Sequence, residues 1–314
     1  MKKIMITLAV CAAFVVSAAA DVSYPEGFLS IVTGHEQSSV ELPLPGDYNW
    51  WYGCSPTAAG MMMGYYDVNG YKGKSYSNLV PGGKAENETF SGRGLVNDII
   101  ASQGHINDFY QGGYQASGDD LPQPWHDFDS LADFMGTSQD AFGLDNGATN
   151  FRFNAYGKET TRETLLYFRG IDNQFNDGML GMCDYIEHAG YKVNEAFNQL
   201  TDVYSSYGGF TFDDYIAEID AGRPMILHVG DTSIGHSIYG YGYDYETGEI
   251  LFHDTWTLGE KRFQWDGTYM TGYGEWKLHS VSGIELAPVP VPSSVLLSSF
   301  GLSIFGWLRR RNCL

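Results

Sequence analysis

Positive charge is scarce in this chain of 314 residues, which holds 18 Lys and Arg against 38 Asp and Glu. The formal net charge of −20 would repel a phosphate backbone, so the composition excludes nucleic acid as an expected partner. Charged residues of both signs make up only 18%, whereas aromatic residues reach 15% and glycine occurs 39 times. So much apolar surface excludes a disordered chain, and the composition favours a loop-rich exported protein.

Cysteine is also scarce, with four residues, of which Cys11 and Cys313 lie near the ends. The body of the chain keeps Cys54 and Cys183, which leaves at most one disulfide there. That disulfide is one interpretation of the pair. The other is that Cys54 is a reactive thiol, because its surroundings have the pattern of a site, while Cys183 stands in a helical apolar pattern typical of a small buried side chain.

The first 20 residues have the composition of a secretory signal peptide. Lys2 and Lys3 give a basic start, residues 4–16 form an apolar run, and residues 17–20 are small. The apolar run is too short to span a bilayer comfortably. We therefore expect cleavage after Ala20 and export of the rest of the chain.

Residues 287–314 form a second end segment of unusual composition. Prolines alternate with valine at 288–292, residues 295–308 are uncharged and mostly apolar, and three arginines follow at 309–311. This layout resembles the PEP-CTERM sorting signal of Gram-negative bacteria, which an exosortase recognises and processes. The resemblance implies transient anchoring in the inner membrane through the C-terminal helix, followed by release to the cell surface or exterior. An ordinary C-terminal membrane anchor is the alternative.

The segment around Cys54 has the pattern of a tight turn followed by a buried helix. Gly53 permits a sharp bend, and Pro56 suits the first turn of a helix, where a missing N–H costs nothing. Residues 58–63 are small or long and apolar, which indicates a central helix. Cys54 thus falls at a helix N-terminus, where the helix dipole and free N–H groups favour the thiolate.

A base and a group to orient it follow far downstream. Residues 235–244 have the pattern of a strand, 246–249 suit a hairpin turn, and 250–256 form the returning strand. His236 begins one strand and Asp254 lies near the end of the other, so antiparallel pairing brings them together. A cysteine nucleophile needs such a base, and the base needs an orienting group.

These motifs resemble those of the bacteriocin-processing (double-glycine) cysteine peptidases of the papain-like clan. In that family the nucleophile lies in a Gly-Cys-x-Pro-Thr-Ala segment, here residues 53–58, and the base in a Gly-His-Ser strand, here 235–237. The acid lies in an Asn/His-Asp-Pro/Thr-Trp segment, here residues 253–256, and the helix–strand run before the histidine matches residues 211–229. The resemblance covers roughly residues 45–70 and 179–265, with the motifs in the family's order.

The resemblance implies an α+β, papain-like fold in which the nucleophile helix packs on an antiparallel sheet carrying the histidine and the aspartate. Cys54 would attack, His236 would act as base and Asp254 would hold the imidazolium. The family's oxyanion-hole Gln is replaced by Tyr48, and Asn49 is the nearest amide, so Asn49 would donate alongside the Cys54 N–H. The domain would span 21–286, with a loop-rich insertion at about 71–168.

Other chemistry fits the sequence less well. His228, His236, His253 and Asp254 lack compact metal-ligand spacing, and His253 should face away from the base side of its strand. The acidic run 126–145 lacks the pattern of a calcium loop, which favours a solvated acidic surface. We expect no cofactor and no metal.

The expected function is that of an exported cysteine peptidase acting on peptide or protein substrates and sorted to the cell surface. The alternative is a non-catalytic surface or matrix protein that uses the scaffold to bind extracellular polysaccharide. Transglutaminases and amidases of the same clan share the triad, so the reaction within the clan stays open.

Overall fold

The computed structural model describes residues 38–43, 46–81, 95–109, 128–172, 174–230 and 235–288. The predicted signal peptide and the apolar and arginine parts of the predicted sorting tail lie outside these residues. Within the described ranges, no helix is long and apolar enough to cross a membrane.

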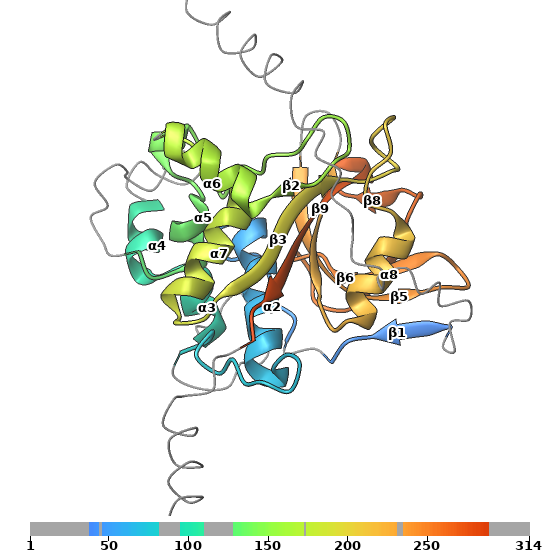
Figure 1. Cartoon of the computed structure of the whole chain (residues 1–314), viewed down its shortest axis with the longest axis horizontal. Helices are drawn as coiled ribbons and strands as arrows, with labels where there is room; N and C mark the ends of the chain where they lie inside the picture. The colour runs from blue at the N-terminus through green and yellow to red at the C-terminus, as the bar shows by residue number, and fades with distance from the viewer. Residues whose placement is uncertain are drawn as a thin grey trace, which may run out of the picture. The chain divides into compact units, whose positions relative to one another are not determined.

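An antiparallel sheet forms one half of the described fold (Figure 1). Its main path runs in the order β2-β3-β9-β4-β5-β6-β7, while β1 pairs with β5 and β8 pairs with β9. The bounds of the strands are β1 Ser39–Glu41, β2 Thr160–Thr161, β3 Val193–Leu200, β4 Met225–Gly230, β5 Gly235–Asp244, β6 Glu249–His253, β7 Lys261–Gln264, β8 Tyr269–Thr271 and β9 Gly274–Leu286.

The helices other than α8 gather beside one part of the sheet, where α2 contacts β5 and β4, whereas α8 packs against β5 and β1 (Figure 1). Their bounds are α2 Cys54–Asn69, α3 Leu95–Ile100, α4 Gln103–Phe109, α5 Leu131–Met135, the 3₁₀ helix η1 Asp140–Phe142, α6 Arg162–Ile171, α7 Gly178–His188 and α8 Phe212–Asp220. Helix α2 is buried from Ser55 to Asp67, as expected for a helix that is apolar on all sides.

The α+β class predicted from the sequence is confirmed by this combination of helices and antiparallel strands. The predicted strand 235–244 has the bounds of β5, and β6 returns beside it with Tyr239 opposite His253. The second strand is shorter than expected because it ends at His253, where the chain turns away from the sheet. The predicted helix after Thr211 is also present as α8, with the Thr211 side chain as its N-cap.

Region 71–168, predicted as an insertion, shares the hydrophobic core with α2. Val96, Ile100 and Leu131 are fully buried in the same cluster as the methionines of α2. The contact is close at Gly60, where an added Cβ would lie 2.4 Å from the Ile100 side chain. In the described structure this region is therefore packed onto the nucleophile helix, and its origin as an insertion stays a prediction.

Candidate active site

Cys54 is the first residue of α2 and follows a tightly constrained turn. Tyr52 and Gly53 both have positive φ, 59° and 148°, which is unfavourable for a residue with a side chain. A Cβ on Gly53 would lie 2.8 Å from Pro56 and 2.9 Å from Thr137. The Thr57 hydroxyl donates to the Gly53 carbonyl at 2.6 Å, which fixes the turn from inside the helix. Glycine is thus required for both its conformation and its size.

The Cys54 thiol is half-buried at the junction of α2 and β5. The backbone N–H of Ser237 donates to its sulfur at 3.4 Å, and His236 shares a hydrogen bond with it. Burial by itself would raise the pKa of this thiol, but the charge of His236, its hydrogen bond and the Ser237 N–H outweigh burial and lower the pKa to about 7. Cys54 is therefore readily ionised near neutral pH.

His236 lies near the start of β5, with only 4% of its surface exposed. Its Nε2 atom donates to the backbone carbonyl of Asp254 at 2.6 Å, because a carbonyl oxygen can only accept. The Nδ1 atom is then left for Cys54. Burial would lower the pKa of His236, but the Cys54 thiolate and the Asp254 carbonyl stabilise the imidazolium, and the net effect is a raised pKa.

The ring of His236 is also covered by an aromatic side chain. Trp256 stacks on the imidazole with a distance of 3.7 Å between ring centroids and an angle of 20° between planes. Trp256 in turn packs against Trp276 and Tyr273. This cover restrains the imidazole and shields its hydrogen bond with Asp254 from water.

The expected role of the Asp254 carboxylate, which was to hold the imidazolium of His236, stays a prediction, and the charge of Asp254 does raise the pKa of His236. That carboxylate accepts hydrogen bonds from the N–H groups of Trp256 and Thr257 at 2.9 and 2.8 Å and from the Tyr269 hydroxyl at 2.8 Å. Burial raises its pKa, but these donors outweigh burial and lower it. The carboxylate thus bonds within the loop after β6, in which Thr255 has a φ of 62°, and the backbone carbonyl of Asp254 faces His236.

Asn49, the expected oxyanion donor, lies in the irregular segment before α2. Among the described residues, its Oδ1 atom is buried and has no hydrogen-bond partner. The backbone N–H of Cys54 belongs to the first turn of α2, whose N–H groups have no partner within the helix. The two groups come from the same short segment, and the oxyanion role of Asn49 stays a prediction.

The remaining histidines of the metal hypothesis have separate partners. His253 is buried with its Nδ1 atom 3.2 Å from an Asp47 carboxylate oxygen, and its ring stacks on Tyr241. His228 contacts the hydroxyls of Ser237 and Ser282 at 3.1 and 3.0 Å. The rings of His228, His236 and His253 thus each bind different groups: serine hydroxyls, the Asp254 carbonyl and the Asp47 carboxylate.

Cys183 and Cys54 are both free thiols, so the disulfide interpretation is wrong for this structure. Cys183 lies within α7, is fully buried and donates to the Met179 sulfur at 3.7 Å. Burial raises the pKa of Cys183 far above the usual range of a thiol. It is a small apolar core residue, as its helical pattern predicted.

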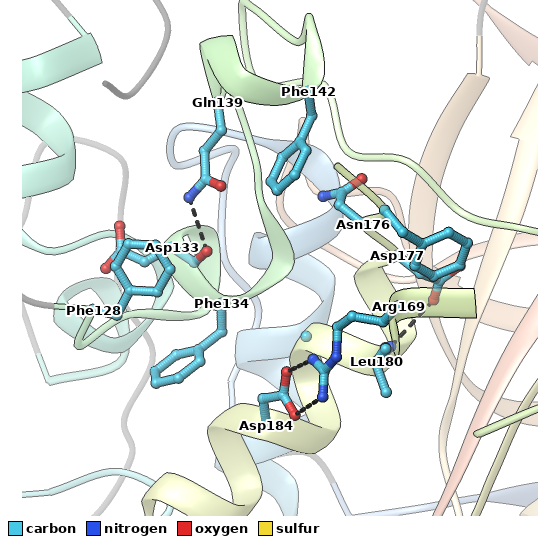
Figure 2. Close-up of a pocket in the computed structure, with 12 residues that line it drawn as sticks. Phe128, Asp133, Phe134, Gln139, Phe142, Arg169, Asn176, Asp177, Leu180 and Asp184 are labelled. Atoms are coloured by element: carbon cyan, nitrogen blue, oxygen red, sulfur yellow. Dashed lines mark hydrogen bonds and ion pairs between the residues drawn. The ribbon is translucent and has the colours of Figure 1, made fainter. Parts of the chain in front are cut away.

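A separate cavity of about 320 Å³ lies between α5, η1, α6 and α7 (Figure 2). Figure 2 shows Arg169 facing Asp184, with which it forms an ion pair. Four phenylalanines line the cavity: Phe128, Phe134, Phe142 and Phe175. The residues that contact Cys54 and His236 do not line it, so this aromatic cavity is distinct from the thiol site.

The sequence motifs do not predict that Trp256 covers His236, nor that Ser55 and Thr255 lie at the site. Ser55 and Ser237 join their hydroxyls at 2.7 Å beside the thiol, and the Thr255 hydroxyl lies 3.3 Å from His236 Nε2. Ser55 and Thr255 each stand next to a residue singled out by the motifs, and Trp256 lies within the motif segment 253–256. Proximity in sequence to Cys54 and Asp254 was therefore the feature that could have identified these residues.

Comparison with known proteins gives one family match. A sequence model described as the Peptidase_C39 like family matches residues 148–279. No curated protein matches the chain. The matched segment is less than half of the chain; it contains His236 and Asp254 and excludes Cys54. It supports a cysteine-peptidase type of scaffold for the part of the chain that carries the sheet.

Proposed function

We propose that this protein is a cysteine peptidase in which Cys54 is the nucleophile and His236 the general base. The observation that carries the proposal is the convergence on one sulfur atom of a helix N-terminus, an imidazole and a backbone N–H donor. The match to the Peptidase_C39 like family supports it. These groups come from segments far apart in the chain, which is typical of a built catalytic site.

In the proposed reaction, His236 Nδ1 accepts the thiol proton and the Cys54 thiolate attacks the scissile carbonyl carbon. The carbonyl oxygen takes up the negative charge, which the Cys54 N–H and the Asn49 amide stabilise. The C–N bond breaks as the imidazolium returns its proton to the leaving amine, which leaves a thioester on Cys54. Water, deprotonated by His236, then releases the acid product and the free thiol.

The test combines an electrophilic thiol probe with a peptide library on the folded protein. We expect the probe to label Cys54, and we expect peptide hydrolysis that Cys54→Ala and His236→Ala each reduce by a factor of about 10³ or more. Cys183→Ala is the matched control and should keep both activities, because Cys183 is buried in the core. Labelling that survives in Cys54→Ala but not in Cys183→Ala would contradict the proposal.

The same experiment separates the related chemistries. Mass spectrometry of the products distinguishes hydrolysis from transfer of the acyl group to an added amine, which a transglutaminase would favour. A folded protein that neither labels nor hydrolyses, but retains extracellular polysaccharide in a pull-down, would support the non-catalytic alternative.

We further propose that the signal peptide exports the protein and that an exosortase-type enzyme processes the tail. The layouts of residues 1–20 and 287–314 support this proposal. In an exosortase-containing Gram-negative host, we expect the full chain on the cell surface or outside the cell. Truncation after residue 286 should change that distribution, and an unchanged distribution would overturn the sorting proposal.

A further inference from the structure

A continuous series of buried side chains leads from the Cys54 sulfur across the sheet. Each neighbouring pair within it lies at hydrogen-bond distance, and each member is at most 9% exposed. We call this series the buried relay; its members in order are Ser55, Ser237, His228, Ser282, Asn198 and Asp177. They belong in turn to α2, β5, β4, β9, β3 and the N-cap of α7. The catalytic roles described above use none of the members beyond Ser237.

The far end of the buried relay fixes the orientation of Asn198. Its Nδ2 atom donates to the Arg152 carbonyl at 3.2 Å and to the Asp177 carboxylate at 3.0 Å. A backbone carbonyl can only accept a hydrogen bond, so the amide cannot be reversed. The Oδ1 atom of Asn198 is therefore an acceptor, and the Ser282 hydroxyl donates to it at 2.6 Å.

The direction of the Ser282–Asn198 hydrogen bond fixes which nitrogen of His228 donates. The single hydroxyl hydrogen of Ser282 is committed to Asn198, so His228 Nε2 must donate to the Ser282 oxygen at 3.0 Å. Burial lowers the pKa of His228 to about 3, which keeps the ring neutral with one N–H. Its Nδ1 atom is consequently an acceptor, and the Ser237 hydroxyl donates to it at 3.1 Å.

The hydroxyls of Ser237 and Ser55 carry the same hydrogen-bond direction to the thiol. Because the Ser237 hydrogen points to His228, the Ser55 hydroxyl must donate to the Ser237 oxygen at 2.7 Å. Ser55 then has only lone pairs for the Cys54 sulfur, 3.9 Å away. If the Ser55 hydroxyl donated to sulfur, it would help to lower the pKa of Cys54. The directions above leave it only lone pairs there, and because the single S–H hydrogen points to His236 Nδ1, these lone pairs place partial negative charge beside the sulfur and disfavour the thiolate.

We propose that His228 is a positioning residue that turns the hydroxyls of Ser237 and Ser55 away from Cys54, so that this side of the site favours the neutral thiol. Ionisation of Cys54 then depends on His236 and on the Ser237 N–H from the other side. The inference rests on the proposed role of Cys54 as the reactive thiol. The other titratable groups that face this site or the buried relay are Asp254, His279 and Asp177.

The first test is Ser55→Ala, a small change at the sulfur itself. Iodoacetamide alkylation of Cys54 is followed by mass spectrometry from pH 4 to 10 on the folded full chain. We expect the profile to move to lower pH, with alkylation at pH 6 about fivefold faster, because the lone pairs that disfavour the thiolate are removed. A profile that moves to higher pH, or does not move, would overturn the proposal.

The second test compares two substitutions of His228. In His228→Leu the Ser237 hydroxyl loses its acceptor, the hydroxyls can reverse toward sulfur, and we expect a shift to lower pH like that of Ser55→Ala. In His228→Gln the side-chain oxygen can accept from Ser237 while the amide donates to Ser282, so the wild-type profile should be kept. His279→Gln is the matched control for loss of a neighbouring imidazole and should leave the profile unchanged.

A purely structural role of His228 would lower the unfolding temperature without separating the alkylation profiles of the Leu and Gln variants. That result would overturn the proposal. The alkylation profile requires no turnover, so the outcomes are distinguishable from failure of the proposed function. Shifted profiles without peptide hydrolysis would remove the peptidase proposal alone, whereas hydrolysis with unshifted profiles would remove the relay proposal alone.

Discussion

Two free cysteines sit in buried helices of this protein and differ in almost every chemical property. Cys54 begins α2, is half-buried and has a pKa lowered to about 7. Cys183 lies inside α7, is fully buried and has a pKa raised far above the usual range by burial. Both helices are apolar and both belong to one core. Helix burial therefore does not decide the reactivity of a thiol here.

The difference comes from what surrounds each sulfur. The Cys54 sulfur meets an imidazole and an N–H donor from β5, whereas the Cys183 sulfur meets the thioether of Met179. Burial disfavours the thiolate at both positions, and only at Cys54 do specific donors outweigh it. The comparison shows that reactivity is supplied by a second, distant element and not by the helix that carries the cysteine.

The largest effect should follow from removing the imidazole. In His236→Ala, burial becomes the dominant influence on Cys54, so its pKa should rise to or above that of a free thiol. The thiolate fraction at pH 7 should then fall from about one half by a factor of about 15 or more. Alkylation kinetics of Cys54 measure this effect. An unchanged rate would erase the distinction between the two thiols.

A large loss of stability should follow from Gly53→Ala. Alanine strains the backbone at a φ of 148° and collides with Pro56 and Thr137, which we expect to cost about 2 kcal/mol or more. Urea unfolding measures the loss. Gly170→Ala in α6 is the control, because its added Cβ meets open space and alanine favours a helix. Equal effects of the two changes would contradict the constrained turn.

A smaller effect should follow from Trp256→Ala. The imidazole of His236 loses its stacked cover and its hydrogen bond with Asp254 becomes accessible to water. We expect alkylation of Cys54 at pH 7 to slow about threefold to tenfold, since about 1 kcal/mol of ring contact is lost. Trp256→Phe should recover most of the rate. A slower rate in the alanine variant without recovery by phenylalanine would argue against stacking as the cause.

The smallest effect should appear at Cys183. In Cys183→Ser a hydroxyl replaces a thiol in an apolar site, which we expect to destabilise the fold by about 1 to 2 kcal/mol. Cys183→Ala should cost less because it buries no polar group. Neither variant should alter the pH profile of Cys54 alkylation. A change in that profile would mean that the two thiols are coupled.

The sequence was informative where local pattern determines structure. The alternation of residues 235–244 predicted β5, and Thr211 predicted the start of α8, because strand and cap preferences act over a few residues. The small and apolar residues after Cys54 likewise predicted a buried helix that begins at the cysteine.

Features that depend on main-chain direction or on distant strands were not predictable in this way. The buried relay takes its members from four strands and two helical segments, and Ser, Asn and His at such spacing have no local signature. The acidic run 126–145 likewise contains a contact with a distant segment that its local pattern does not predict. Asp133 was expected on a solvated surface, yet it is buried, caps α5 and lies 3.1 Å from His105, a partner 28 residues away.

The atom that orients His236 belongs to the polypeptide backbone and not to a side chain. A codon change at position 254 can disturb the loop that its carboxylate holds, but every amino acid supplies a carbonyl at that place. Side-chain scanning would therefore register Asp254 as a determinant of loop stability and overlook the acceptor that directs the imidazole. In this site the acceptor that orients the imidazole is set by the path of the backbone after β6.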